Sequence, residues 1–494
     1  MFAVAPEPPR LTLPKYLLLA LLLLLLADLG HSFTQYYYTP LDGDVCDNVV
    51  PNSLFKPVLA NPLGLKALTQ DSLYANPNKF FSHYAQYHYF RHVPQWLQRF
   101  VDPVESVFLA SALVKLGTHI MLLWGLAFLS TGRWWSSRTL VSAAIMAPLF
   151  QAYGYRSYMG VIDPAVTYVF FYALPLSWCI GLFIPVANYL WKEQPISGWT
   201  TLLVGLPLGL VSALSGPLNP AVTILGSGVV GLLLISRGLD DLVQPRIPLG
   251  ARLARVYQLH RSLVLYLSVP VFCAAYSLYL GSYNSLSASS QIELTTSYGK
   301  LLVGLGDLLT AKLGWPILLV FGLLNCYLLR RFVGSATNRQ VAQALGWIGL
   351  FAALYLVLLP FGGYRAYRSY LIRYDTLLPV TLMVVAFVGG STVRLLTSLP
   401  TWYRRWYVAL PVVVGLTFTL ADEPNFAANA CQLEALEKIR SADRGAVAVA
   451  ADCKVFSWST SQDPTAFRLN AELMVILGIT DTTRLYFNAA PEAE

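Results

Sequence analysis

The stretch YLLLALLLLLLADL, residues 16–29, decides the class of fold, because it is apolar over most of the length needed to cross a bilayer. Arg10 and Lys15 precede it, as in the positively charged start of a signal peptide. The segment that follows, residues 27–32, is a poor match to the small-residue site at which signal peptides are cleaved. We therefore interpret the run as an uncleaved membrane anchor.

Similar apolar runs recur along the chain and predict an all-α polytopic membrane protein with about eleven spans, roughly 9–13, of about 20 residues each. The composition agrees, since 56% of the 494 residues are hydrophobic and 12% are charged, against about 25% charged in soluble proteins. The runs are continuous rather than alternating, which excludes an outer-membrane barrel. The expected spans are 14–31, 106–130, 139–154, 163–190, 200–215, 218–236, 262–281, 312–329, 341–360, 375–396 and 407–421.

Lys and Arg fall mainly in alternate connections between these runs, which predicts a cytoplasmic N-terminus and an extracytoplasmic C-terminus in a plasma (bacterial inner) membrane. Most of the basic residues behind the net charge of +8 lie in short connections, where they set the orientation of the protein in the lipid bilayer. The charge therefore does not indicate a nucleic-acid partner. We expect residues 1–421 to form the transmembrane domain, with residues 32–104 as a long first outer loop. Residues 422–494 should form a small α/β outer domain, in which Cys431 and Cys453 are disulfide candidates because the compartment is oxidising.

One outer connection, GGYRAYRSYLIRYD at residues 362–375, breaks the charge pattern. Arg365, Arg368 and Arg373 could each fork onto phosphate oxygens, which indicates a site for an anionic headgroup or phosphate. Two other interpretations remain open. Asp375 could pair with one of the arginines, or the arginines could extend to the membrane interface without binding anything.

An acidic motif, Asp42-Gly43-Asp44, lies on the same predicted side, just after the first span. Glycine allows a sharp turn that brings the two carboxylates together. They could hold a divalent cation such as Mg²⁺ or Mn²⁺, or one of them could act as a general base. The alternative is an ordinary solvated turn, since Asp-Gly is common in turns. The preceding QYYYTP, residues 35–40, would keep the motif near the lipid surface.

The aromatic stretch KFFSHYAQYHYFRH, residues 79–92, predicts a helix at the membrane interface. His83, His88 and His92 within it could bind a metal, although interfacial polar side chains are commoner. Lys115 and His119 lie inside the second expected span, where a charge is costly and is therefore a functional candidate. The alternative is that Lys115 extends to the outer edge of the membrane. Further candidates for an outer cavity are Tyr38, Asp47, Glu105, Asp163, Tyr364 and Asp375.

This layout resembles the GT-C superfamily of integral-membrane glycosyltransferases. Its elements are a cytoplasmic N-terminus, an acidic motif after the first span, a long outer loop, late outer arginines and an outer C-terminal domain. The resemblance implies a base at Asp42 or Asp44, and a phosphate ligand at Arg365, Arg368 or Arg373. It also implies transfer of a sugar from a polyprenyl-phosphate donor to a glycan, lipid or protein acceptor. The chain has D-G-D where that superfamily commonly has adjacent acidic residues, and it also resembles bacterial polytopic membrane proteins of unknown function.

Two other classes of function remain open. A transporter or flippase of an anionic lipid or solute would use the same arginines with Lys115, although the chain has no internal repeat of the kind that transporters show. A scaffold would bind a partner through its outer loops. The enzyme requires Asp42 or Asp44 and the arginines to face one outer cavity, with the aromatic stretch Phe80–Phe90 at its rim.

Overall fold

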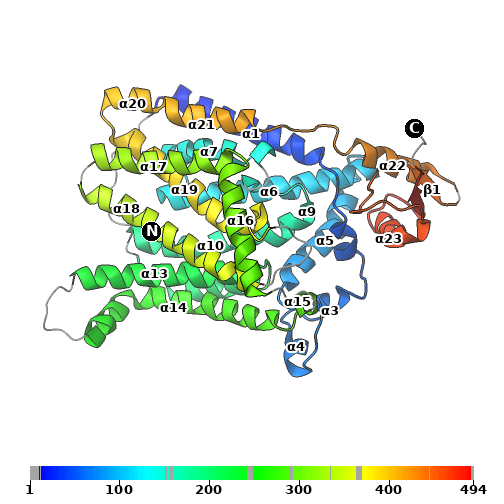
Figure 1. Ribbon diagram of the computed structural model, residues 1–494, viewed down its shortest axis with the longest axis horizontal. Helices are drawn as coiled ribbons and strands as arrows, with labels where there is room; N and C mark the ends of the chain where they lie inside the picture. Colours follow the sequence, from blue (N-terminus) through cyan, green and yellow to red (C-terminus); the bar gives the residue numbers. More distant parts are fainter. Residues whose placement is uncertain are drawn as a thin grey trace.

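The protein is mostly helical, and its helices run mainly along the long axis of the molecule (Figure 1). The computed structural model describes residues 11, 13–150, 153–155, 159–192, 194–241, 249–288, 293–333, 335–362, 370–443 and 445–490, with the backbone alone for residues 153, 237–241, 249, 287–288 and 335–342.

Eight helical segments in the described chain are long and apolar enough to cross a membrane, which confirms the predicted all-α polytopic class. The number of spans, about eleven by sequence, stays a prediction. The eight segments are α1 (Lys15–Tyr37), α6 (Pro103–Thr131), the run Val166–Lys192 formed by α9 (Val166–Tyr168), η2 (Val169–Ala173) and α10 (Leu174–Lys192), Asn219–Ser236 in α13 (Asn219–Asp241), Gly250–Gly281 in α14 (Leu249–Gly281), α17 (Gly314–Phe332), Gln343–Gly362 in α18 (Ser335–Leu358) and η4 (Leu359–Gly362), and α19 (Tyr374–Ser398).

Shorter apolar helices occupy the three expected runs that these segments leave out. The first, α7 (Ser137–Phe150), packs against α1, α6 and α19. The second is formed by α11 (Gly198–Thr200), η3 (Thr201–Gly205) and α12 (Leu206–Ala213), of which α12 packs against α10 and α14. The third, α21 (Ala409–Leu420), follows α20 (Thr401–Tyr407) and packs against α7.

The central helix α6 has clear signals at both ends. Asp102 is its N-cap and accepts a hydrogen bond from the backbone N–H of Val104 at 2.8 Å, while Pro103 occupies the first helical position. Gly132 ends the helix in the left-handed conformation, with φ of 72°. Between these ends α6 contacts α1, α7, α10 and α19, so it lies at the centre of the largest hydrophobic core.

The segment predicted to be the first outer loop, which keeps this name below, contains four helices at one end of the bundle: α2 (Asp44–Val49), α3 (Lys56–Leu59), α4 (Leu65–Thr69) and α5 (Phe80–Leu97) (Figure 1). Helix α5 corresponds to the helix predicted from the aromatic stretch, and it packs against α6. Ser82 Oγ donates to the carbonyl of Phe170 at 2.8 Å, and Gln86 Nε2 donates to Thr167 Oγ1 at 2.7 Å. These buried polar contacts hold α5 close to the start of the third long helical run.

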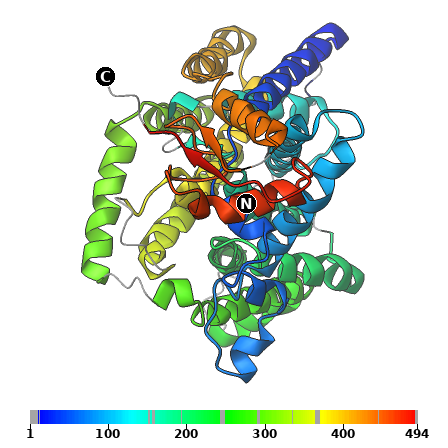
Figure 2. The ribbon, with the colours of Figure 1, turned by 90° about the vertical axis from the view of Figure 1, so that its right-hand side faces the viewer.

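The C-terminal residues form a small α/β unit beside this loop, at the end of the molecule that faces the viewer in Figure 2. It contains α22 (Ala430–Ser441), β1 (Val447–Val449), η5 (Pro464–Phe467), α23 (Arg468–Ile476) and β2 (Tyr486–Asn488). The two strands are parallel, with Val447 opposite Tyr486. Cys431 and Cys453 form a disulfide, with Cα atoms 5.9 Å apart.

The hydrophobic core of the C-terminal unit is shared with the first outer loop. Val49 of α2, Phe90 of α5 and Leu436 of α22 belong to one buried cluster, together with Met474 of α23 and Tyr486 of β2. A unit this small cannot bury a large core alone. Packing against the loop therefore fixes its position over the end of the bundle.

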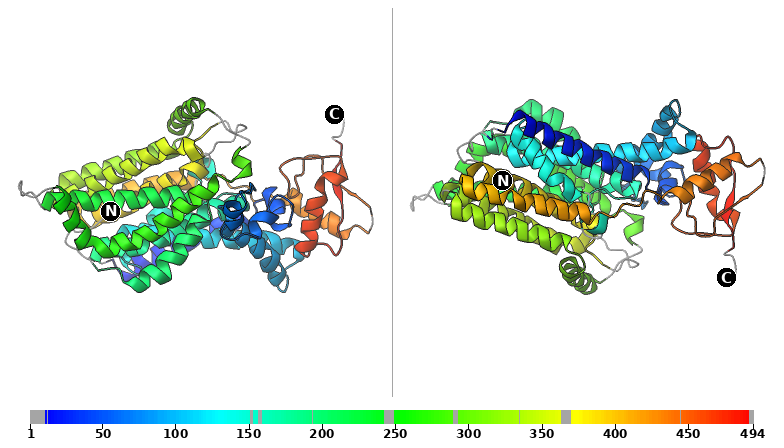
Figure 3. Two further views of the ribbon diagram at one scale, coloured as in Figure 1. Left: turned by 90° about the horizontal axis from the view of Figure 1, so that it is seen from below. Right: turned by 90° about the horizontal axis from the view of Figure 1, so that it is seen from above.

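Among the described residues, α16 (Leu294–Thr310) is a long helix that sequence analysis did not anticipate. It lies across the direction of the bundle in Figure 1 and is seen end-on in both views of Figure 3. Its buried positions, Ser297, Leu301, Gly304 and Leu308, recur every three or four residues. This spacing is that of an amphipathic helix, which an analysis based on continuous apolar runs does not detect.

Candidate functional site

Asp42 lies just beyond the end of α1, in a turn that its own carboxylate stabilises. Its side chain is buried, with 5% exposed. Oδ1 accepts a hydrogen bond from the backbone N–H of Asp44 at 3.1 Å, and Oδ2 accepts one from the backbone N–H of Thr167 at 3.1 Å. The first bond closes a local turn. The second reaches the first turn of the run Val166–Lys192, so Asp42 joins the outer loop to a membrane helix.

The surroundings of Asp42 change its basicity. Burial raises the pKa of the carboxyl above its ordinary value, because the charged form loses its hydration. Hydrogen bonds from Thr167 act in the opposite direction, Asp44 raises the pKa further, and Lys115 lowers it. Because the net shift is upward, the carboxylate is a stronger base than a solvated aspartate.

Gly43 separates the two aspartates at a point where the C-terminal unit comes very close. A Cβ atom at this position would lie 2.6 Å from Cδ1 of Trp458 and 2.7 Å from its backbone nitrogen. The indole Nε1 of Trp458 donates a hydrogen bond to Oδ1 of Asp44 at 2.9 Å. The D-G-D turn is therefore packed against another part of the chain and is not simply a solvated turn.

A cavity of about 350 Å³ lies beside Asp42, where the membrane helices meet the C-terminal unit. Its walls come from the end of α1, from the segment before α9 and from the C-terminal unit. Helix α5 contributes none of the described lining, contrary to the expectation that the aromatic stretch forms the rim. The described lining residues are Gln35, Tyr36, Thr39, Pro40, Leu41, Asp42, Phe150, Gly160, Ile162, Pro164, Ala165, Pro424, Asn425, Ala428, Gln432, Lys454, Ser457 and Trp458.

A buried histidine packs behind the membrane side of this cavity. Tyr36 and Phe150 line the cavity, and His119 of α6 contacts both of them from behind. The Tyr36 hydroxyl is 3.1 Å from Nδ1 of His119, and the imidazole stacks on the Phe150 ring with centroids 4.8 Å apart. His119, which sequence analysis selected as a candidate, therefore supports the cavity wall and is not one of its lining residues.

Lys115 also supports this cavity. Its side chain is fully buried in α6, and Nζ donates a hydrogen bond to the carbonyl oxygen of Pro164 at 2.6 Å. Because Pro164 lines the cavity, this bond holds one of its walls in place. The ammonium group also acts electrostatically on Asp42. Lys115 is therefore a positioning residue for the site, which neither of the sequence interpretations specified.

The cation in the described lining of this cavity is Lys454, which sequence analysis missed. Gln432 connects it to the acidic turn, because Nε2 donates to the carbonyls of Leu41 at 2.9 Å and Lys454 at 2.7 Å. Oε1 of Gln432 accepts from the Leu41 backbone N–H at 2.9 Å. The expected pairing of Cys431 with Cys453 would have placed Lys454 near Gln432, but no sequence signal placed either beside Asp42.

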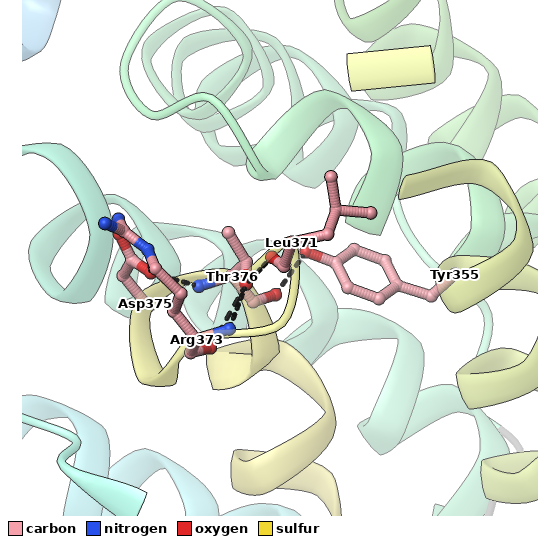
Figure 4. A network of polar contacts seen from close by, with 5 residues as sticks. All are labelled: Tyr355, Leu371, Arg373, Asp375 and Thr376. Atoms are coloured by element: carbon pink, nitrogen blue, oxygen red, sulfur yellow. Dashed lines mark hydrogen bonds and ion pairs between the residues drawn. The ribbon is translucent and has the colours of Figure 1, made fainter. Parts of the chain in front are cut away.

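Arg373 and Asp375 form an ion pair at the start of α19 (Figure 4). Nε of Arg373 donates to Oδ1 of Asp375 at 3.1 Å, and the same oxygen accepts from the backbone N–H of Thr376 at 2.8 Å. Tyr355 donates to the carbonyl of Thr376 at 2.7 Å, which ties this turn to α18. The ion-pair interpretation of this part of the arginine cluster is therefore the one that the structure shows.

Asp375 and Asp163 line a second, much smaller cavity of about 10 Å³. The segment 160–165 separates it from the first, because Gly160 lines both, Val161 and Asp163 face the smaller one, and Ile162 and Pro164 face the larger one. Arg373 does not belong to the described lining of the Asp42 cavity. Tyr364, Arg365 and Arg368 lie outside the described residues, so their approach to Asp42 stays a prediction.

The histidines of α5 lie away from this cavity. His83 is buried, its Nε2 is 3.1 Å from the amide nitrogen of Asn76, and burial lowers its pKa to about 3. The rings of His88 and His92 stack with centroids 5.8 Å apart. In the described part of the chain, no group of three or more His, Cys, Asp or Glu side chains is arranged to hold a metal ion.

The remaining candidates are distributed around the end of the molecule that carries the C-terminal unit. Asp47 accepts a hydrogen bond from Asn52 at 3.0 Å, and burial raises its pKa. Tyr38 contacts the ring of Phe426, with centroids 5.9 Å apart. Glu105 is exposed in the first turn of α6. None of these three side chains belongs to the described lining of the Asp42 cavity.

The structure therefore unites part of the predicted site. Asp42 lines the cavity, and Asp44 accepts a hydrogen bond from Trp458, which also lines it. Lys115 and His119 support the cavity from within the bundle. In comparisons with known proteins, the chain matches no protein-family model and no curated protein sequence.

Proposed function

We propose that the protein is a membrane glycosyltransferase that moves a sugar from a polyprenyl-phosphate donor to an acceptor hydroxyl at the outer face of the membrane. The observation that carries this proposal is the position of Asp42. Its carboxylate is held by two backbone N–H groups and lines a cavity of about 350 Å³. This cavity lies where apolar helices meet a polar unit, a boundary that suits a substrate with a sugar at one end and a lipid at the other.

In the proposed reaction, Asp42 takes the proton of the acceptor hydroxyl as the hydroxyl oxygen bonds to the anomeric carbon of the sugar. The bond from that carbon to the phosphate oxygen breaks, and its electron pair leaves with the polyprenyl phosphate. Direct displacement inverts the anomeric configuration. The carboxylate of Asp42 accepts one backbone hydrogen bond at each oxygen and a further one from the side chain of Thr167. A carboxylate has about four acceptor sites, so the base is oriented without being saturated.

Negative charge grows on the leaving phosphate, and a cation in the same cavity would stabilise it. Lys454 occupies such a position. Arg365 and Arg368 remain in the proposal as phosphate ligands implied by the GT-C resemblance. Arg373 would have to exchange its bond to Asp375 for one to phosphate, so we assign it a positioning role at the start of α19. Asp44 would help to position the turn by accepting the hydrogen bond from the indole of Trp458.

The direct test uses the purified protein in proteoliposomes with radiolabelled polyprenyl-phosphate hexoses and pentoses, and with glycan, lipid and protein acceptors. Transfer with an inverted anomeric configuration supports the proposal. Movement of the donor across the bilayer without transfer would favour the transporter alternative. Binding of a partner with neither transfer nor movement would favour a scaffold.

Replacing Lys454 by glutamine should raise the KM for the donor about tenfold or more, because a charge-assisted hydrogen bond to phosphate contributes about 1.5 kcal/mol or more. The measurement is the initial rate of transfer against donor concentration. Lys438→Gln is the matched control, since Lys438 is an exposed lysine of the same unit that does not line the cavity. Equal KM values for the two variants would remove Lys454 from the site.

The pH dependence of transfer should reflect the raised pKa of Asp42. The carboxylate must be deprotonated to act as a base, so activity should be low below its pKa and rise as the pH passes through it. We expect the acid limb of kcat/KM above the ordinary aspartate value of about 3.9. Asp47→Asn should leave this limb in place, because Asp47 is outside the cavity lining. An acid limb below about 4 would argue against Asp42 as the base.

A further inference from the structure

Another polar cavity, called the arginine cavity below, lies at the end of the bundle opposite the C-terminal unit. Helix α6 connects the two ends. At its start, Asp102 forms an ion pair with Arg440 of the C-terminal unit, and at its other end Thr131 lines the arginine cavity. The 29 residues of α6 span about 43 Å at about 1.5 Å per residue. This cavity is therefore remote from Asp42 and independent of the proposed reaction.

Two arginines line this cavity of about 60 Å³: Arg138 of α7 and Arg394 of α19. Their guanidinium groups are close enough to repel each other electrostatically. No carboxylate belongs to the described lining. The lining also includes hydroxyl groups, which can donate hydrogen bonds to an anion. Besides the arginines it consists of Ser130, Thr131, Trp191, Phe387, Gly390, Ser391, Val393 and Thr397.

An apolar groove of about 170 Å³ adjoins this arginine cavity. Helices α6, α10, α13, α18 and α19 contribute to it, and its described lining contains no charged side chain. Trp191 lines both the groove and the arginine cavity. Along α19, Met383 and Ala386 line the groove, and Phe387 and Arg394 line the arginine cavity further along the same helix. The two spaces therefore follow one another along α19.

We propose that the arginine cavity and the apolar groove together bind one anionic phospholipid of the surrounding membrane. Its phosphate would accept hydrogen bonds from Arg138 and Arg394, whose planar guanidinium groups match phosphate oxygens. One acyl chain would lie in the groove, where only an apolar ligand fits without losing hydrogen bonds. A phosphate bound by both arginines would bridge α7 and α19, so the lipid also stabilises the contact between these two helices.

The test uses the full-length protein in neutral detergent, titrated with dioleoylphosphatidylglycerol and observed by native mass spectrometry. We expect one tightly held lipid on the wild-type protein. The affinity of Arg138→Gln/Arg394→Gln should be at least about tenfold lower, because the charged hydrogen bonds to the phosphate are lost. A tenfold loss corresponds to about 1.4 kcal/mol of binding free energy. The matched control is Arg330→Gln/Arg331→Gln, which removes the same charge from exposed positions at the end of α17. It should bind as the wild type does.

Two further variants keep the proposal testable if the glutamine variant does not fold. Arg138→Lys/Arg394→Lys retains the charge and should bind with intermediate affinity. Ala187→Trp, in the half-buried wall of the groove, should weaken binding without any change of charge. Phosphatidylglycerol with brominated acyl chains should quench tryptophan fluorescence, and less so in Trp347→Phe, because Trp347 lines the groove.

Equal affinity for phosphatidylcholine and phosphatidylglycerol would overturn the role of the arginines. Equal affinity for inorganic phosphate and phosphatidylglycerol would overturn the role of the groove. Unchanged binding by both the Arg138→Gln/Arg394→Gln and the Ala187→Trp variants would overturn the site as a whole.

Discussion

Replacing Asp42 by asparagine should lower sugar transfer by at least about 100-fold, the lower end of what a general base contributes. Asparagine keeps the size of the side chain and one acceptor oxygen, so it retains the hydrogen bond from either Asp44 or Thr167, while its NH2 group faces the other N–H at a cost of about 1–3 kcal/mol. It cannot take up a proton from the acceptor hydroxyl. The measurement is kcat in proteoliposomes at saturating donor and acceptor.

Asp44→Asn is the matched control for this experiment. It also removes one carboxylate from the D-G-D turn, but its Oδ1 can still accept the hydrogen bond from Trp458. We expect a much smaller loss of transfer, with the donor KM near that of the wild type. If Asp42→Asn kept full activity while Asp44→Asn lost it, the roles of the two aspartates would be exchanged. Full activity of the double variant would exclude the proposed mechanism.

Replacing Gln432 by glutamate should destabilise the contact between the C-terminal unit and the D-G-D turn by about 2–4 kcal/mol and reduce transfer strongly. The buried amide of Gln432 donates to the carbonyls of Leu41 and Lys454, and its oxygen accepts from the N–H of Leu41. A carboxylate cannot donate to either carbonyl, and each unsatisfied buried group costs about 1–3 kcal/mol. The measurement is denaturant unfolding in detergent, followed by the near-ultraviolet signal, together with the transfer rate.

Gln98→Glu separates general destabilisation from loss of the cavity. Gln98 also connects the C-terminal unit to the bundle, since Nε2 donates to the carbonyl of Leu477 at 2.7 Å, but it does not line the cavity. We expect this variant to lose stability while retaining more of its transfer activity. If Gln432→Glu and Gln98→Glu reduced transfer equally at equal stability, Gln432 would have no special role in shaping the Asp42 cavity.

Local chemistry allowed several features to be predicted from the sequence. Long apolar runs such as residues 16–29 predict helices that cross a bilayer, because lipid offers no partners to backbone polar groups. The aromatic stretch predicted the helix α5. The D-G-D motif was recognised as a turn because the Asp-Gly pair and the short reach of the aspartate side chain act within a few residues.

Only the tertiary structure decided which groups meet at the site. Asp42 contacts Thr167 at a separation of 125 residues, and Lys454 approaches the same cavity from the far end of the chain. Arg373 could have faced either a substrate or Asp375, and side-chain types alone do not distinguish the two. The sequence by itself therefore determined a helical membrane protein with an acidic turn just after its first apolar helix, because hydropathy and turn chemistry act locally. The partners of that turn depended on packing between distant segments, which no local pattern records.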